Sequence, residues 1–109
     1  MHRSSSELAG LGRFEEAAVL VLTSLIDGPR HGYGIIKDME AVAGVQLAAG
    51  TLYAALSRLE TFGLVEPLPP EERRRPYRIT GAGLAFVRDR LSRMEAIARS
   101  GLGRLAAQP

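Results

Sequence analysis

Arginines gather in one short stretch in the second half of the chain, where they could bind phosphate groups. Arg73–Arg75 are consecutive, and Arg78 follows three residues later. The guanidinium group presents its N–H donors in a planar fork that matches phosphate. In complexes of proteins with DNA, the phosphates and sugars of the DNA backbone take about half or more of the hydrogen bonds. Glu71 and Glu72 directly precede the run and partly offset its positive field. By itself, the run could therefore be a phosphate-binding loop or only a solvated one.

A helix with two different faces is predicted shortly before the arginines, over residues 49–62, and Gly63 ends it. On a helical wheel its apolar residues fall in one narrow arc, and small or polar residues fall opposite them. The apolar arc holds Leu52, Leu56 and Leu59, and the opposite arc holds Thr51, Ala54, Arg58 and Thr61. Such a face can enter a major groove, although an ordinary solvated face would look the same from this helix alone.

Two strand-like runs, residues 64–68 and 77–80, enclose the arginines. The prolines and charges of residues 69–76 predict an exposed hairpin tip between them. A two-faced helix followed by a basic hairpin is the layout of a recognition helix and a β-wing. This order favours DNA binding, with the arginines on backbone phosphates or in the minor groove.

Two more helices are predicted upstream, over residues 13–26 and 31–43, because apolar residues recur at helical spacing in both. The first is apolar on more than one face, which fits either a central place in the fold or a contact with another subunit. His31 is expected to begin the second helix with its ring hydrogen-bonded, and Gly32 permits a close approach of other groups to the backbone. Residues 45–47 are expected to form an edge strand or an extended connector.

A long final helix is predicted from Gly81 to Arg99 or Leu105, with Thr80 as its cap. An apolar stripe runs along it through Leu84, Val87, Leu91, Met94, Ala98, Leu102 and Leu105. Because no later element covers this stripe, a second copy of the chain is its simplest partner. Packing against the first helix of the same chain is the alternative.

The composition limits the class of protein further. With 109 residues, of which 46% are hydrophobic, the chain has room for one domain with a modest core. It has no cysteine, two histidines outside any metal-ligand spacing and no glycine-rich phosphate loop, so we expect no catalytic site, metal or cofactor. No apolar run is long enough to span a bilayer, and the first residues lack the pattern of a signal peptide, so we expect a soluble cytoplasmic protein without a membrane partner.

The charge is unevenly distributed along the chain. Residues 1–54 carry four basic and six acidic residues, a net charge of −2, whereas residues 55–109 carry ten and six, a net charge of +4. The positive charge is therefore concentrated in the half that contains the predicted wing. Thirteen of the fourteen basic residues are arginine, which suits phosphate and guanine but can also reflect the base composition of a genome.

These elements predict a mainly α fold with a small β-wing (α+β), a winged helix-turn-helix with a long C-terminal dimerisation helix. In the expected organisation, residues 1–12 are a flexible tail and residues 13–80 the DNA-binding domain. Residues 81–105 are the dimerisation helix, and residues 106–109 a flexible end.

Four stretches of the chain resemble one known family. They are Leu20-Val21-Leu22 to Ile26 followed by Gly28-Pro29-Arg30-His31-Gly32-Tyr33-Gly34-Ile35; Gly50-Thr51-Leu52-Tyr53 with Leu56, Arg58, Leu59 and Glu60; Gly63-Leu64-Val65; and Tyr77-Arg78-Ile79-Thr80 with Gly83. This combination, spread over roughly residues 14–86, resembles the PadR-like transcriptional regulators. The resemblance implies a winged helix-turn-helix that dimerises through its C-terminal helix, and often through its N-terminal one, and usually acts as a repressor. The short C-terminal region is similar to the small subfamily with a single terminal helix, in which some members bind planar or multidrug-like effectors at the dimer centre.

The resemblance also implies which residues contact DNA. They are Tyr33, Lys37, Gly50, Thr51, Tyr53, Arg58, Arg73, Arg74, Arg75, Tyr77 and Arg78. The wheel adds Ala54, which like Thr51 could touch a thymine methyl group.

The residues expected at a dimer interface, or in an effector pocket within it, come from the first and last helices. They are Phe14, Ala17, Val21, Leu84, Val87, Arg88, Leu91, Met94 and Ala98. They could equally be dimer core alone. The chain has no tryptophan, so an aromatic sandwich for a flat effector would depend on phenylalanine or tyrosine.

The chain departs from the family at the start of the predicted recognition helix. Ala48 and Ala49 stand where the family commonly has serine and proline. A missing cap typically costs about 1 kcal/mol, so this helix start is expected to order fully only on DNA.

The sequence thus predicts a homodimeric repressor that binds a palindromic operator in double-stranded DNA and is released by a small hydrophobic effector. A winged-helix module that binds only proteins is the alternative, because a fold does not fix a function.

Overall fold

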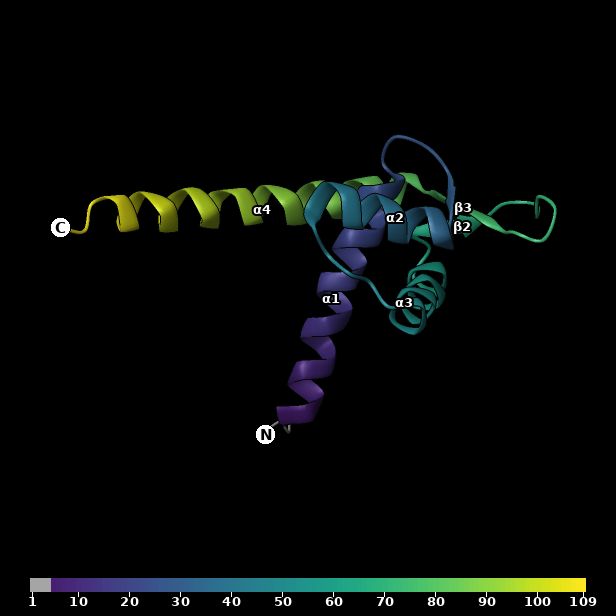
Figure 1. Ribbon diagram of the computed structural model, residues 1–109, viewed down its shortest axis with the longest axis horizontal. Helices are drawn as coiled ribbons and strands as arrows, with labels where there is room; N and C mark the ends of the chain where they lie inside the picture. Colours follow the sequence, from purple (N-terminus) through teal and green to yellow (C-terminus); the bar gives the residue numbers. More distant parts are fainter. Residues whose placement is uncertain (1–4) are drawn as a thin grey trace.

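The computed structural model describes residues 5–109, with side chains described from Phe14 onward. Along the chain, the elements are α1 (Ser5–Leu25), β1 (Arg30–His31), α2 (Gly32–Ala43), α3 (Ala49–Thr61), β2 (Val65–Pro67), β3 (Pro76–Ile79) and α4 (Gly81–Ala106). Helices α1, α2 and α3 pack against one another, the small sheet lies at one side of them, and α4 runs across them and out of the body (Figure 1). The predicted fold class, mainly helical with a small β-wing, is confirmed.

The core lies where the apolar faces of α1, α2 and α3 meet. Its fully buried side chains include Leu22, Leu25, Ile35, Met39, Leu52, Leu56, Leu59, Val65 and Val87. Those in α1, α2 and α3 recur at helical spacing, so one face of each of these three helices is removed from water. Gly44 ends α2 in the left-handed conformation, with φ 65°, which glycine adopts without steric cost.

The sheet is antiparallel in the order β1-β3-β2, and β2 and β3 form the wing. In β1, Arg30 pairs with Tyr77 of β3, so the start of α2 is joined directly to the wing. Sequence reasoning missed β1 because a strand of two residues has no periodicity to detect. Of the two expectations for residues 45–47, an edge strand or an extended connector, the structure has the connector.

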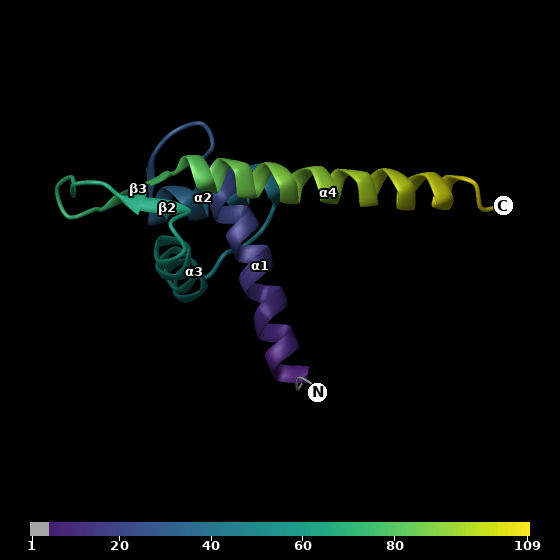
Figure 2. The same cartoon turned by 180° about the vertical axis from the view of Figure 1, so that it is seen from behind.

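Helix α4 has a buried beginning and an exposed end. Thr80 caps it, since its Oγ1 accepts the N–H of Gly83 at 3.0 Å and donates to the carbonyl of Gly63 at 2.7 Å. Gly83 packs so closely on the Leu64 carbonyl that a Cβ there would overlap it. From Ser92 onward every residue is exposed, and this end points away from the wing (Figures 1 and 2).

Two of the predicted boundaries differ from the structure. Helix α1 begins at Ser5, so residues 5–12 of the predicted tail are helical, while residues 1–4 lie outside the described part. The predicted boundary between the DNA-binding domain and the dimerisation helix, at residue 80, does not separate two structural units either. Val87 of α4 is buried in the core of the domain. Among residues 5–109, no helix is long and apolar enough to cross a membrane.

Candidate nucleic-acid interface

Helix α3 has the two faces that the sequence predicts. Leu52, Leu56 and Leu59 are at most 1% exposed. The opposite face, formed by Thr51, Ala54, Arg58 and Thr61, is exposed together with Gly50. Apolar burial therefore fixes the rotation of α3 about its axis and leaves the small polar face outward.

The first turn of α3 has no side-chain cap. Ala48 occupies the N-cap position with extended φ and ψ of −68° and 143°, and its methyl group cannot accept a hydrogen bond. The first N–H groups of a helix have no partner within the helix, so here they depend on solvent or on a ligand. This agrees with the expected absence of a cap at Ala48.

Arg58 lies on the exposed face of α3 and packs against α1. Its Cζ is 3.9 Å from the centroid of the Phe14 ring, within the range of a cation–π contact. Phe14 also meets Phe62 edge to face, with the ring centroids 6.3 Å apart. A guanidinium group on a ring face can keep its in-plane N–H donors available for other groups. The stack therefore orients Arg58 without using its donors.

The tip of the wing is a tight turn. The Glu71 N–H donates to the Arg74 carbonyl at 2.7 Å, and the Arg74 N–H donates to the Glu71 carbonyl at 2.9 Å. Arg73, Arg74 and Arg75 are all exposed. Arg78, by contrast, donates from Nε and Nη2 to Oε1 of Glu66, its cross-strand neighbour. The ion pair with Glu66 thus sets Arg78 apart from the three tip arginines.

A hollow of about 350 Å³ joins the wing to the start of α2 and to α3. It is lined by His31, Gly32, Tyr33, Tyr53, Arg73, Arg74, Arg75 and Tyr77. The structure therefore brings six of the predicted DNA-contacting residues around one concave, basic surface, which we call the wing hollow. Gly32 makes this possible, because a Cβ there would overlap the Tyr53 phenol. Lys37 lies just outside, with Nζ 5.5 Å from the Tyr33 ring centroid.

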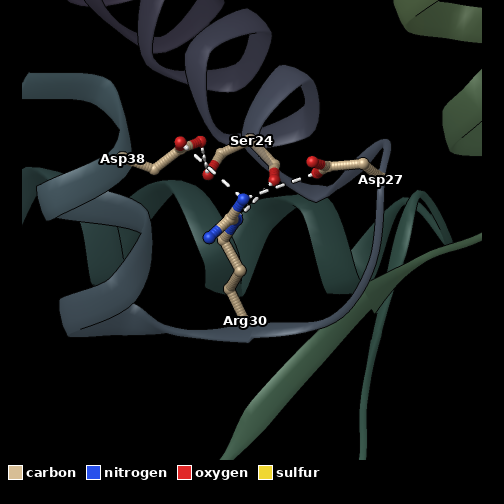
Figure 3. Close-up of polar contacts among 4 residues, drawn as sticks. All are labelled: Ser24, Asp27, Arg30 and Asp38. Atoms are coloured by element: carbon tan, nitrogen blue, oxygen red, sulfur yellow. Dashed lines mark hydrogen bonds and ion pairs between the residues drawn. The ribbon is translucent and has the colours of Figure 1, made fainter. Parts of the chain in front are cut away.

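Polar contacts around Arg30 hold this side of the hollow in place (Figure 3). Arg30 Nε donates to the Ser24 carbonyl at 2.9 Å, and its Nη2 lies 3.5 Å from Asp27 and 3.7 Å from Asp38. Ser24, which is 1% exposed, donates from Oγ to Asp38 at 2.7 Å. These bonds tie the end of α1 and the side of α2 to β1, which positions His31 beside the wing.

His31 is the N-cap of α2, and sequence reasoning did not include it in the interface. Its Nδ1 accepts the N–H of Gly34 at 3.2 Å, so the expected hydrogen-bonded ring is confirmed. Its Nε2 lies 3.2 Å from Nη1 of Arg74 in the wing. Only the pairing of β1 with β3, which local sequence does not reveal, brings the two side chains together.

The residues predicted at a dimer interface fall into separate groups. Leu84, Val87, Arg88 and Leu91 border a second hollow of about 280 Å³ beside Ile26. Met94 and Ala98 lie further along α4 and are exposed. Phe14 and Ala17 border the exposed face of α3 instead.

Val21 requires a correction. It is completely buried in the core of its own chain, and Ala17 and Val87 are only 3% and 1% exposed, so these three residues offer almost no surface to a partner. Because α1 is apolar on several faces, the sequence alone did not show which of them point inward.

The fold and this basic surface define a winged-helix protein of the kind that binds DNA to regulate transcription. The family model described as the transcriptional regulator PadR-like family matches residues 21–89. The chain belongs to this family, whose members are DNA-binding transcription regulators and not enzymes.

Individual relatives agree with this assignment. The chain is 36% identical to the transcriptional regulator Rv3488 of Mycobacterium tuberculosis over 98 residues. This match covers 83% of this chain and 88% of that protein. It is 49% identical over 71 residues to a 37.1 kDa protein of transposon TN4556 from Streptomyces fradiae, covering 65% of this chain but only 21% of that protein. A solved PadR family regulator from Eggerthella lenta superposes with a TM-score of 0.69 at 30% identity, covering 95% of this chain and 93% of that one.

Proposed function

We propose that this chain is a homodimeric repressor that binds a palindromic operator in double-stranded DNA. The observation that carries the proposal is the wing hollow, because it joins the arginines of the wing to the exposed face of α3 through Tyr53. In this arrangement α3 enters the major groove while the wing follows the neighbouring backbone. The proposed DNA contacts are Tyr33, Lys37, Gly50, Thr51, Tyr53, Ala54, Arg58, Arg73, Arg74, Arg75, Tyr77 and Arg78.

The exposed end of α4 supports the homodimer. Met94, Leu102 and Leu105 are 52%, 67% and 70% exposed and belong to the predicted apolar stripe. Burying such a side chain is worth about 1.5 to 3 kcal/mol, so pairing this stripe with its copy would stabilise a two-fold dimer. A symmetric dimer would present two α3 helices about 34 to 36 Å apart, which matches half-sites one helical turn apart.

Binding to selected duplexes at two salt concentrations tests the proposal. Oligonucleotides selected from a random pool should contain an inverted repeat, and the affinity for them should fall steeply with added salt. In a reporter assay, an operator placed at a promoter should lower expression when the protein is present. A protein without salt-steep DNA affinity would instead be a winged-helix module for protein contacts.

Release by a small hydrophobic effector is the second part of the proposal. The hollow between α4 and Ile26, the residue that follows α1, supports it, because Leu84, Val87 and Leu91 give it apolar walls next to the exposed stripe. A planar apolar compound that releases the operator should shift the methyl resonances of these three residues. Release accompanied by shifts elsewhere would move the effector site away from this hollow.

A further inference from the structure

Two hydrogen-bond donors face each other across the wing hollow. A neutral imidazole has one N–H and one acceptor nitrogen, and the Nδ1 of His31 is already the acceptor for the Gly34 N–H at 3.2 Å. Its Nε2 therefore carries the proton. Arg74 has only donors, and its Nη1 lies 3.2 Å from this Nε2. Neither group can satisfy the other.

Two donors at this distance fit a single acceptor that both can reach. The other side chains that line the hollow are Arg73, Arg75 and three tyrosines, and none of these described lining residues is acidic. The hollow therefore concentrates positive charge and hydrogen-bond donors around His31 and Arg74. An anion with several acceptor oxygens is the ligand chemistry that this surface suits.

We infer that His31 is a DNA-binding residue, and that its Nε2–H and the guanidinium of Arg74 bind one phosphate of the DNA backbone between them. The inference rests on the proposed function, since it assigns a backbone phosphate to the wing hollow of a DNA-binding surface. His31 is well suited to this role because the Gly34 N–H fixes its ring and its tautomer. The start of α2 adds to the attraction, because the N-terminus of a helix favours a negative charge.

A His31→Ser variant separates phosphate binding from helix capping. Serine keeps an oxygen for the N-cap bond, so the urea midpoint of unfolding should stay close to that of the wild type. The outward donor is removed, so the affinity for the selected duplex should fall about tenfold, the effect of one hydrogen bond to a charged group. His31→Ala removes the cap as well and should lower both the affinity and the stability. A His31→Ser variant that binds the duplex as tightly as the wild type would overturn the inference.

Methylphosphonate substitution identifies the phosphate. In a series of duplexes, one symmetry-related pair of phosphates at a time is replaced by the neutral analogue. At one pair, the replacement should weaken binding by the wild type and have little further effect on binding by His31→Ser. If every position weakens both proteins equally, His31 binds no particular phosphate and the inference is wrong.

Nitrogen NMR of the histidine ring tests the geometry directly. In a His2→Gln background His31 is the only histidine, and its free spectrum should be that of the Nε2–H tautomer. The Nε2 resonance should shift on adding the selected duplex and shift far less with inorganic phosphate at the same concentration. An Nδ1–H tautomer, an unshifted Nε2 in a complex that forms, or an equal response to free phosphate would each overturn the inference alone. If no duplex is bound, the proposed function fails, and the inference fails with it.

Discussion

Arg58 stacks on an aromatic ring at the exposed face of α3. Its Cζ lies 3.9 Å from the Phe14 ring centroid, so its in-plane donors can meet the O6 and N7 atoms of a guanine. We predict that Arg58→Ala weakens binding to the selected operator by about 1 to 3 kcal/mol, and random DNA much less. Titrations of both duplexes measure this, with Arg104→Ala as the control for the removed charge. An equal loss of affinity on both duplexes would assign Arg58 to the backbone.

Gly83 is required by a close approach between α4 and the chain at Leu64. A Cβ at this position would overlap the Leu64 carbonyl oxygen, which is backbone and cannot rotate away. We predict that Gly83→Ala lowers the free energy of unfolding by about 1 to 3 kcal/mol, as for other overpacked sites. Urea denaturation measures the change. Gly81→Ala is the matched control, because Gly81 lies in the same turn with nothing within 4 Å of its Cβ position, and it should be neutral or slightly stabilising.

Single residues could be predicted from sequence where their role is local. Thr80 could be assigned as a cap because a threonine preceding an apolar helical repeat satisfies N–H groups a few residues away. The contact of His31 with Arg74 could not, since 43 residues separate the two. Likewise, no pattern around Arg58 indicates that it stacks on Phe14, because that contact depends on how α1 and α3 pack.

At the scale of elements, α3 begins without a side-chain cap, which a substitution can supply. Ala48 is already in the extended conformation of an N-cap but offers no acceptor. We predict that Ala48→Ser stabilises the protein by about 1 kcal/mol, because its hydroxyl can accept an N–H from the first turn of α3. Thermal and urea unfolding check this against Ala48→Val, which has no acceptor and should give no gain. A serine variant no more stable than the wild type would show that the turn is already satisfied.

The wing should contribute to affinity mainly through charge. Replacing Arg73, Arg74 and Arg75 with glutamine should reduce the slope of log affinity against log salt by about 0.9 for each phosphate that the wing no longer neutralises. Replacing Arg93, Arg99 and Arg104 removes the same charge from the exposed end of α4, which points away from the wing (Figure 1). This control should change the slope much less. A wing variant with an unchanged slope would exclude the tip from the interface.

The long elements could be predicted and the short ones only in part. Each helix spans 12 residues or more, so its apolar period is visible in the sequence. The prolines and charges of residues 69–76 indicate the wing, because they fit an exposed hairpin tip. β1 has two residues and exists only through its pairing with β3, so tertiary contact and not local sequence creates it. As a result, the wing hollow could not be predicted, although most of its residues were named.

At the scale of the whole molecule, the proposed DNA-binding surface at the wing and the exposed stripe of α4 lie toward opposite ends, so they can be altered separately (Figure 2). We predict that Met94→Glu, which puts a charge into the apolar stripe, converts the dimer to a monomer in sedimentation and weakens binding to a full palindrome more than to a half-site. Ser100→Glu is the matched control, because it adds the same charge at an exposed position outside the stripe and should leave the mass unchanged. A Met94→Glu variant that remains dimeric would place the dimer interface on another surface of the chain. The two chains on adjacent half-sites would then have to pair through that surface and not through the apolar stripe of α4.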